Sequence, residues 1–475
     1  MSESAVLRRA DLERSPLSLM DEAGVTYFWR DRVLRAVPPE SAAGVKRLFA
    51  SGLIEALMAK RWIPNCSMSA MRIEGAALVV EQERLPVVTY PYEWTFGMLR
   101  QAAMRVLEVN ALANEYGWEL KDCHGFNVVF DGTQPLFVDL GSFVPRPQGA
   151  RDWVAYEEFR RSYLYPLHIW KDGGGYIARR VLAASEMMRE EDYGLYRWPW
   201  TRLDGGRRYA RWVKLQDRWR RLQRMTDAYV RMHHPGLGGR LLCATKRMRW
   251  LPGRRVEILT LHAQVAAMRR RGGGGFWSNY QKGGEAFLNT PRFRRVAEII
   301  AGLGVRSMLE LAGNQGRLSS RLLEAEVVGR ATCTDNDELA VDLGFERERA
   351  TNGRLHTAVL DFVHPMVSPF GEPPSTRLQA DVVLALAVTH HLLLTHRLPI
   401  ERVFGAIGCN ARRFVLVEFM PLGLWDGRRG DPVPPWYTLE WFRAAFVKQF
   451  ELVLEERLEE NRHLFCGEIR SDKAT

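Results

Sequence analysis

The stretch RSMLELAGNQGRLSSRLL, residues 306–323, decides the fold of the second half of the chain. It opens with a short apolar run that closes at Glu310, continues through a turn that contains Gly313 and Gly316, and ends with the apolar spacing of a helix. Strand, glycine turn and helix in this order point backbone N–H groups and a helix N-terminus at a ligand. The turn alone is a weak signal, because a loop can contain two glycines for other reasons.

The sequence that follows alternates in the same way. Short apolar stretches such as RATCTD, LHTAVLDF, ADVVLALAV and RFVLVEF are separated by amphipathic stretches of helical length. This alternation predicts βαβ units and a parallel sheet covered by helices on both faces. Near the end, ELVLEERL and HLFCGEI are close enough to pair as an antiparallel edge. We therefore predict a Rossmann-like α/β domain whose mostly parallel sheet has seven strands.

Acidic residues stand at the ends of the first three predicted strands. Glu310 ends the first, Asp335 ends the second in CTD, and Asp361 ends the third in VLDF. A carboxylate after the second strand can accept both hydroxyls of a ribose, and one after the third can reach an adenine amino group. No GK[ST] motif and no second glycine-rich cradle is present, which disfavours a pyrophosphate or triphosphate ligand. Glu310 suits a positively charged ligand, with an amino group or a sulfonium.

Residues 276–475 thereby resemble class I S-adenosylmethionine-dependent methyltransferases. By this resemblance, Glu310 would hold the amino end of the methionyl part of S-adenosyl-L-methionine, and Asp335 would bind the ribose. Asp361 and Phe362 would flank the adenine. A nucleotide-free Rossmann-like fold is the alternative.

The same resemblance assigns the turn to the floor of the cofactor site. Its residues there are Ala312, Gly313, Asn314 and Gly316. Ala312 and Asn314 stand where glycines are common in the family, and asparagine tolerates left-handed backbone angles well. In FWSNYQ, Trp277 and Tyr280 would cover the carboxylate of the cofactor, while simple packing at the domain entrance is an equal alternative.

Three residues are candidates for catalysis. The sulfonium is already activated, so alignment of the acceptor and removal of one proton are the remaining tasks. His390 and His391 follow the fourth strand in AVTHHLLL, where an imidazole can take a proton, and His391 is preferred. Glu418, at the end of the fifth strand, is the second candidate; its alternative role is a hydrogen bond to a neighbouring loop. Packing or capping is the alternative for the histidines. The long, aromatic and proline-rich WDGRRGDPVPPWY suits an acceptor-binding loop.

The first half of the chain contains a second informative stretch, residues 120–143. Asp122 and Asn127 have the spacing D-x4-N, and Asp139 follows in VDLGS. This pattern resembles the protein-kinase and aminoglycoside-phosphotransferase superfamily, in which the first Asp accepts a proton and the Asn and second Asp hold magnesium. No G-x-G-x-x-G loop and no strand lysine precedes it. An inactive or repurposed kinase-like domain is therefore favoured, with ATP and magnesium only if that domain is active.

The seam between the halves is RRRGGGG, because four successive glycines lose much backbone entropy on ordering. We predict a small kinase-like N-lobe at 1–93, a helical C-lobe at 94–255, a linker at 256–275 and the methyltransferase domain at 276–475. The stretches YPYEW, PLFVDLGSF and VTHHLLLTHRLPIERV resemble a bacterial family of two-part methyltransferases that includes nodulation proteins of the NoeA type. That resemblance implies the fused architecture and names no acceptor.

Composition limits the partners. The formal net charge is +11, but only nine of the 67 basic residues are lysine, so arginine-rich codon usage accounts for the charge and no specific nucleic acid is expected. The six cysteines are scattered without a CxxC pair, which argues against a zinc site and for a reducing compartment. No apolar run is long enough for a membrane span and no secretory signal is visible, so a cytoplasmic protein is expected. No metal is predicted, and the oligomeric state is open.

Four functions remain. The first is a methyltransferase that acts on a hydroxyl of a saccharide-like or small-molecule acceptor, with the front domain assisting. The second is a bifunctional kinase and methyltransferase, and the third is a nucleic-acid methyltransferase, which would bind with steep salt dependence. The fourth is a non-catalytic interaction protein, which would fail to bind S-adenosyl-L-methionine.

Overall fold

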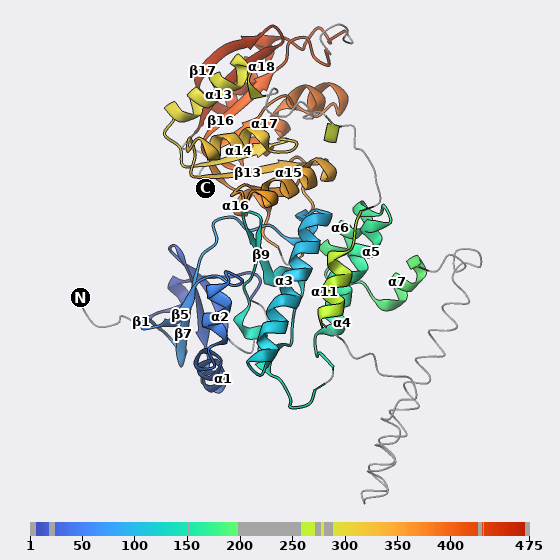
Figure 1. Cartoon of the computed structure of the whole chain (residues 1–475). Helices are drawn as coiled ribbons and strands as arrows, with labels where there is room; N and C mark the ends of the chain where they lie inside the picture. Colours follow the sequence, from blue (N-terminus) through green and yellow to red (C-terminus); the bar gives the residue numbers. More distant parts are fainter. Residues whose placement is uncertain are drawn as a thin grey trace, which may run out of the picture.

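The structure is a computed structural model in two parts, an N-terminal part with a small sheet and helices and a C-terminal α/β part (Figure 1). It describes residues 6–18, 24–150, 152–197, 258–270, 277–279, 288–369, 371–425, 430 and 432–470. The basic stretch at 246–257 and the glycines at 272–275 lie outside these residues. In the described part no helix is long and apolar enough to cross a membrane.

The N-terminal sheet is antiparallel, with strand order β2-β3-β4-β7-β5. Its strands are β2 Glu13–Arg14, β3 Val25–Trp29, β4 Arg32–Val37, β5 Cys66–Ser69 and β7 Leu78–Glu83. A separate parallel pair joins β1 Val6–Leu7 to β6 Arg72–Ile73. Between β4 and β5 the chain forms α1 Pro39–Ala50 and α2 Leu53–Ala59, where the sequence predicts one helical stretch. The break falls at Gly52, whose φ of +82° ends α1 in a left-handed residue.

Helix α3, Phe96–Glu115, is the centre of the helical subdomain. Thr95 caps it by accepting a hydrogen bond from the N–H of Met98. Five residues at helical spacing form one fully buried face of this helix: Leu99, Ala102, Val106, Val109 and Ala113. Around it lie α4 Tyr156–Phe159, a π-helical turn at Arg160–Leu164, α5 Tyr165–Lys171, α6 Gly175–Ala183 and α7 Glu190–Arg197.

Part of the predicted linker is helical instead. Residues Ile258–Ala266 form α11, which packs against α3, and Leu261 and Val265 join the N-terminal hydrophobic core. The apolar spacing of this stretch is short, and only the partner surface on α3 shows that it belongs to the core. The N-terminal unit therefore extends beyond the predicted boundary at residue 255.

Two antiparallel strand pairs, one nested inside the other along the chain, connect α3 to the later helices. Strand β8, Trp118–Leu120, pairs with β11, Phe143–Pro145, and β9, Val128–Asp131, pairs with β10, Gln134–Phe137. Between paired strands lie the 3-10 turns Gly125–Asn127 and Leu140–Ser142. The first turn contains Asn127 of the motif D-x4-N, and the second follows Asp139 of the downstream D-L-G. The two turns are close together, because the amide of Asn127 donates to the hydroxyl of Ser142 at 3.5 Å.

The C-terminal sheet has the order β14-β13-β12-β15-β16-β18-β17, in which β18 is antiparallel to both of its neighbours. This confirms a mostly parallel sheet of seven strands closed by an antiparallel pair. The strands are β12 Ser307–Leu311, β13 Arg330–Asp335, β14 His356–Val359, β15 Ala380–Ala385, β16 Ala411–Phe419, β17 Phe450–Glu459 and β18 Arg462–Ile469. From β12 the chain builds the sheet first toward β14 and then, starting with β15, in the opposite direction. The carboxyl ends of β12 and β15 therefore border the topological switch point, where such sheets bind ligands.

Helices cover both faces of this sheet, as predicted. They are α13 Pro291–Gly302, α14 Arg317–Glu324, α15 Glu338–Ala350, α16 Pro374–Arg377, α17 Ile400–Gly408 and α18 Leu439–Gln449. Alternate residues of one strand enter different cores, since side chains point to opposite faces along a strand. Leu309 and Leu311 pack on one side with α17 and α18, and Met308 packs on the other with α13 and α14.

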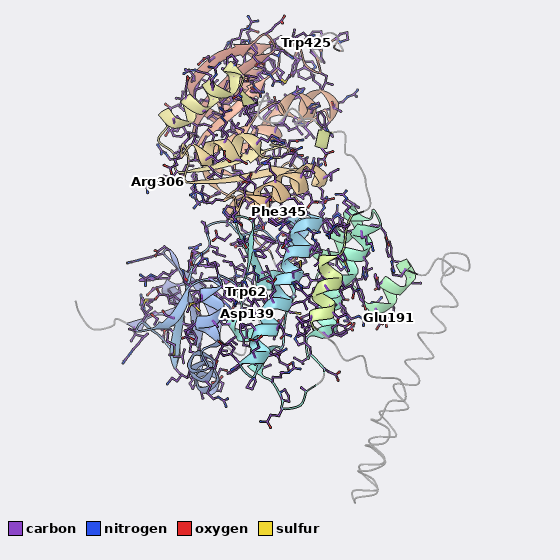
Figure 2. The ribbon with its side chains drawn as sticks, in the orientation of Figure 1. Trp62, Asp139, Glu191, Arg306, Phe345 and Trp425 are labelled. Atoms are coloured by element: carbon purple, nitrogen blue, oxygen red, sulfur yellow. The ribbon has the colours of Figure 1, made fainter. Side chains whose placement is uncertain are left out.

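The two parts contact each other through α3, α15 and the segment before α3. Phe345 of α15 is fully buried in the N-terminal core, and Figure 2 shows it at the boundary between the parts. Its neighbour Asp342 accepts a hydrogen bond of 2.8 Å from the N–H of Gly97, in the first turn of α3. A carboxylate at a helix N-terminus is favourable because the N–H groups there lack partners within the helix.

A buried ion pair also joins the parts. Arg377 donates to both carboxylate oxygens of Glu93, at 2.9 and 2.5 Å, and both side chains are at most 3% exposed. The same guanidinium donates to the carbonyl of Val88 and lies 3.9 Å over the ring of Tyr90. Because the Arg377 guanidinium binds Glu93 through two nitrogens, it fixes the position of the segment before α3 relative to α16.

We expect Arg377→Ala to lower the free energy of unfolding by about 3 kcal/mol, because it leaves the Glu93 carboxylate buried without a partner. Urea denaturation followed by tryptophan fluorescence measures this loss. Arg32→Ala is the matched control, since the Arg32–Glu81 pair is partly exposed and should change the value by less than about 1 kcal/mol. A loss at Arg377 no larger than at Arg32 would contradict the role of the buried pair, and the double variant Glu93→Gln with Arg377→Met should recover part of it.

Candidate functional site

The turn after β12 is held in a left-handed conformation at three residues. The φ angles are +54° at Ala312, +57° at Asn314 and +67° at Gly316. Gly313 lies against other atoms of the site, because an added Cβ would be 2.6 Å from Cys333 Sγ and 2.7 Å from Glu310 Cδ. The turn therefore tolerates the non-glycine residues at 312 and 314, whereas residue 313 has no room for a side chain.

The carboxylates of Glu310 and Asp335 lie on either side of this turn. Asp335 accepts hydrogen bonds from the backbone N–H groups of Asn314, at 2.7 Å, and Asp337, at 2.8 Å. Glu310 accepts one from the hydroxyl of Ser319, at 2.5 Å, on α14. The parallel register places β12 beside β13, so the two strand ends meet at one edge of the sheet. The sequence pattern did not reveal Ser319.

Both carboxyl groups are harder to ionise than usual. Burial, with the negative charge of Asp335 nearby, raises the pKa of Glu310 from its ordinary 4.5 to about 7 despite the hydrogen bond from Ser319. Burial raises the pKa of Asp335 to about 6, although backbone N–H groups of Asp337 and Asn314 oppose the shift. Neither group forms an ion pair within the part of the chain that the structure describes. These raised pKa values mean that the two carboxyl groups are only partly ionised near pH 7, and a cationic ligand would favour their ionised forms.

Asp361 and Phe362 follow β14, the neighbour of β13. The N–H of Leu360 donates to the carbonyl of Asp335 at 2.9 Å, which ties this loop to the end of β13. The Asp361 side chain is 41% exposed and accepts from the N–H groups of Val363 and His364. Phe362 is buried in the core under the same edge. The adenine contacts expected of these two residues stay a prediction.

Trp277 lies against the turn. Asn314 donates from its side-chain amide to the carbonyl of Trp277 at 2.8 Å, and Gln315 donates in the same way to Ser278 at 3.0 Å. The indole, 40% exposed, meets the ring of His391 edge-on with 4.9 Å between centroids. Trp277 thus links the glycine turn to the histidine pair. Tyr280, its predicted companion, lies outside the described residues.

His390 and His391 begin a π-helical turn, His391–Thr395, after β15. Their rings are 4.0 Å apart. Burial lowers the pKa of His390 to about 3, and burial also lowers the pKa of His391. Both imidazoles are therefore neutral near pH 7, which leaves a ring nitrogen able to accept a proton.

Glu418 is fully buried between two arginines. Arg292 contacts both of its oxygens at 2.6 Å, and Arg462 contacts one at 3.0 Å. The same carboxylate accepts from the N–H of Ala387, whose φ is +52°. Arg292 lies 126 residues away in sequence, so no local pattern could have found this triad. These bonds favour a positioning role for Glu418 over that of a proton acceptor, since its lone pairs are already in use.

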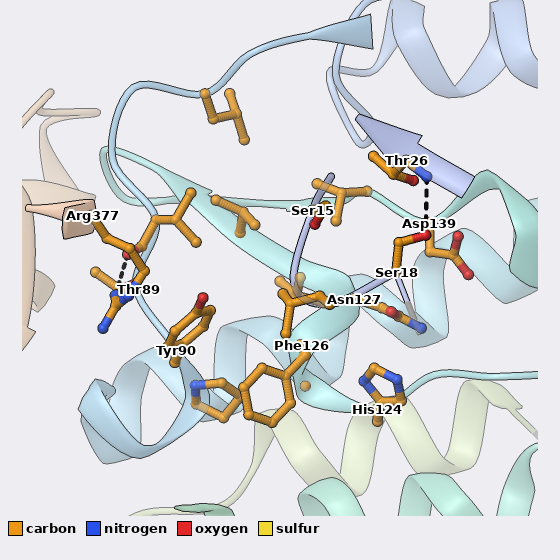
Figure 3. A pocket seen from close by; sticks show the side chains of 18 of the residues that line it. Ser15, Ser18, Thr26, Thr89, Tyr90, His124, Phe126, Asn127, Asp139 and Arg377 are labelled. Carbon is orange, nitrogen blue, oxygen red and sulfur yellow. Dashed lines mark hydrogen bonds between the residues drawn. The ribbon is translucent and has the colours of Figure 1, made fainter. Parts of the chain in front are cut away.

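A second candidate site is a cavity of about 1010 Å³ that residues of both parts line. Figure 3 shows Tyr90, His124, Phe126, Asn127 and Asp139 around it, with Arg377 at one end. The three residues of the predicted kinase-like motif, Asp122, Asn127 and Asp139, all line this cavity. The amide of Asn127 donates to Asp122 at 3.3 Å.

The oxygens of Asp139 already have partners, which the sequence did not suggest. Arg35, on strand β4, donates to Oδ1 at 2.6 Å, and the hydroxyl of Ser142 donates to Oδ2. The N–H of Gly141 also donates to Oδ1. Burial alone would raise the pKa of Asp139, but Arg35 and these hydrogen bonds lower it below the usual value. Magnesium requires carboxylate oxygens that can coordinate it, but the Arg35 guanidinium and the Ser142 hydroxyl already bind the oxygens of Asp139. The groups around Asp139 therefore do not fit a magnesium ion.

Asp122 has an acidic neighbour, Glu158, on α4. Burial and a hydrogen bond with Asp122 raise the pKa of Glu158 to about 8, so Glu158 holds a proton at neutral pH. Asp122 also accepts from the N–H of His124 at 3.3 Å. Asp122 thus already accepts hydrogen bonds from the N–H of His124 and the amide of Asn127, and a protonated carboxyl group lies beside it.

Gly313→Ala tests the close packing of the turn. We expect it to lower the free energy of unfolding by about 2 kcal/mol, because the added methyl overlaps Cys333 and Glu310. Gly405→Ala, inside α17 with open space around the added Cβ, is the control and should be neutral or raise stability by up to about 1 kcal/mol. Equal effects of the two substitutions in thermal unfolding would show that the turn is not tightly packed.

Comparison with known proteins finds a similar chain of nearly equal length. The nodulation protein NoeA of Rhizobium meliloti (strain 1021) is 26% identical over 486 residues, which covers 96% of this chain and 94% of that protein. No protein-family profile matches.

Among solved structures, the N-methyltransferase NodS from Bradyrhizobium japonicum WM9 is 13% identical and aligns with 39% of this chain and 99% of its own, with a TM-score of 0.29. An S-adenosylmethionine-dependent methyltransferase from Clostridium acetobutylicum ATCC 824 is 10% identical and covers 40% of this chain and 98% of its own, with a TM-score of 0.30. At these scores the fold assignment rests on the strand order, not on the alignments. Over both of its parts, and along nearly its whole length, the chain is similar to NoeA.

Proposed function

We propose that the protein is an S-adenosyl-L-methionine-dependent methyltransferase that acts on a hydroxyl group of a saccharide-like or small-molecule acceptor. The observation that carries the proposal is the pair of buried carboxylates at the carboxyl edge of β12 and β13, which have raised pKa values and no ion-pair partner in the described part. Such a site favours a ligand with positive charge, and the left-handed turn between them leaves the backbone open to close approach.

The chain's residues have distinct binding roles in this proposal. Asp335 binds the ribose hydroxyls, Glu310 holds the amino group of the methionyl part, and the turn around Gly313 forms the floor. Asp361 and Phe362 border the adenine, because their loop is tied to the end of β13. Trp277, which the Asn314 amide holds against the turn, covers the site.

His391 accepts the proton of the acceptor hydroxyl. S-adenosyl-L-methionine supplies a methyl group that is already activated by positive charge on sulfur. The neutral imidazole of His391 would accept the proton of the acceptor hydroxyl as its oxygen bonds to the methyl carbon and the carbon–sulfur bond breaks, which would release the uncharged thioether S-adenosyl-L-homocysteine. Water would then take the proton from His391. Trp277 orients the ring through its edge contact, and His390 packs behind it. Glu418 is a positioning residue that ties the loop at Ala387 to Arg292.

The acceptor is expected to lie against the loop that precedes α18. Gly423 packs against Leu394 of the π-helical turn, since an added Cβ would be 2.8 Å from that side chain. Trp436, 47% exposed, lies edge-on to Trp441. An exposed indole in this loop offers a flat apolar face with a polar edge, which suits a sugar ring.

The N-terminal part is proposed to have a kinase-like fold that assists binding. An antiparallel sheet with helices inserted after β4, a connecting segment, the long helix α3 and the loop with Asp122 and Asn127 support it. Phosphoryl transfer by this part is disfavoured, because Arg35 and Ser142 occupy the oxygens of Asp139. A bifunctional enzyme would show magnesium-dependent ATP binding lost in Asp139→Ala.

Asp335→Asn should weaken S-adenosyl-L-methionine binding at least about tenfold in isothermal titration calorimetry, because it removes one acceptor for the ribose hydroxyls. The substitution keeps the shape of the side chain but removes one acceptor from the N–H groups of Asn314 and Asp337, so circular dichroism and thermal unfolding must show that the variant is folded. Glu298→Ala, exposed on α13, is the control and should leave the affinity unchanged. No measurable binding to the unaltered protein, or full binding by Asp335→Asn, would refute the proposed cofactor site.

The affinity for S-adenosyl-L-methionine should rise about tenfold between pH 6 and pH 8, as Glu310, with a pKa of about 7, ionises and can pair with the cationic ligand. The ligand-free fold has the opposite dependence. The pKa of Glu310 in the folded protein, about 7, exceeds the ordinary 4.5, so folding favours the protonated form of this group. Its contribution to the free energy of unfolding is therefore lost as the pH rises through about 7. Calorimetry across this range measures the affinity.

The control for this dependence is Glu310→Gln, which should bind more weakly at pH 8 and show a flatter profile. If Glu310→Gln keeps the same rise in affinity with pH, the titrating group is another one.

A further inference from the structure

The cavity between the two parts does not belong to the cofactor site. Its C-terminal lining comes from the amino ends of the strands, where β13 begins at Arg330 and where Arg412 lies near the start of β16. The carboxylates Glu310 and Asp335 lie at the opposite, carboxyl ends of the strands. A ligand in this cavity would therefore leave the proposed cofactor site free.

Arg330 and Arg412 both line this cavity, and Asp381 is the carboxylate that acts on both of them. Neither makes an ion pair or a side-chain hydrogen bond with any residue that the structure describes. Burial and the positive charge of Arg412 lower the pKa of Arg330, so the two guanidinium groups repel each other. Asp381 is near both, but it already accepts the N–H groups of Arg306 and Ser307 at 2.9 Å each. One carboxylate between two arginines leaves an excess of positive charge.

The other end of the cavity reaches the motif in the N-terminal part. There Arg35 neutralises Asp139, and both oxygens of that carboxylate already accept hydrogen bonds, which disfavours a divalent ion at this position. Tyr90 and Phe126, with ring centroids 5.3 Å apart, supply an aromatic wall in between. A cavity of about 1010 Å³ with an apolar wall and a basic end has the size and chemistry of a small-molecule site.

We propose that this cavity binds a phosphate-bearing ligand without a divalent metal, and that Arg330 and Arg412 hold the phosphate. The planar fork of arginine matches phosphate oxygens in pairs, and two such forks suit a doubly charged group. The remainder of the ligand lies toward Tyr90 and Phe126. The proposal is independent of the methyl-transfer reaction, because the two sites are at opposite ends of the strands.

The test is calorimetric titration of the full chain with inorganic pyrophosphate, ADP and glucose 1-phosphate, each with EDTA and again with excess magnesium. We expect at least one probe to bind in EDTA with an affinity that magnesium does not increase. Tighter binding of ADP than of pyrophosphate identifies a nucleotide as the source of the phosphate, and tighter binding of glucose 1-phosphate identifies a sugar phosphate. No binding of any probe, or binding that requires magnesium, overturns the proposal.

The variant is Arg330→Gln with Arg412→Gln, which should weaken binding of that probe at least about tenfold. Arg413→Gln is the matched control, because Arg413 is the next residue on β16 and does not line the cavity. Equal weakening by Arg413→Gln would indicate a general charge effect and overturn the assignment. Unchanged circular dichroism and unchanged S-adenosyl-L-methionine affinity in both variants show that neither a fold defect nor the cofactor site is responsible.

Discussion

The burial of two carboxylates at one edge of the C-terminal sheet is the constraint on which the site depends. Glu310 and Asp335 are adjacent because β12 and β13 are parallel neighbours, and no cation pairs with them in the described part. Burying such groups costs free energy, which backbone N–H groups at Asp335 and the Ser319 hydroxyl at Glu310 offset only partly. A site built at this cost is adapted to a ligand of opposite charge.

The second constraint is the fixed contact between the two parts. Helix α15 begins just after Asp337, a partner of Asp335, and the same helix receives the N-terminus of α3 at Asp342 and buries Phe345 in the N-terminal core. The N-terminal part therefore contacts α15, the helix that follows β13 and Asp335. The pair Glu93–Arg377 fixes a second point of the boundary, next to the large cavity.

The cavity between the two parts contains the residues of the predicted kinase-like motif, but their hydrogen bonds do not suit phosphoryl transfer. Asp122, Asn127 and Asp139 line the same cavity. Asp139 nevertheless already accepts hydrogen bonds from Arg35 and Ser142, and the protonated Glu158 is hydrogen-bonded with Asp122. Internal hydrogen bonds stabilise the pocket and at the same time remove the open oxygens that a metal needs. Binding without phosphoryl transfer is the function that this arrangement favours.

The sequence by itself determined the C-terminal sheet, its antiparallel edge, the buried face of α3 and the positions of Glu310 and Asp335 at strand ends. These follow from local periodicity and from the rule that parallel strands end at one edge, both of which are written in consecutive residues. Only the tertiary structure decided which side chains pair with two other carboxylates that the sequence singles out, Asp139 and Glu418. Arg35 meets Asp139 across 104 residues and Arg292 meets Glu418 across 126. The packing of α11 on α3 is likewise non-local, since a short apolar helix is not stable until a partner surface covers it.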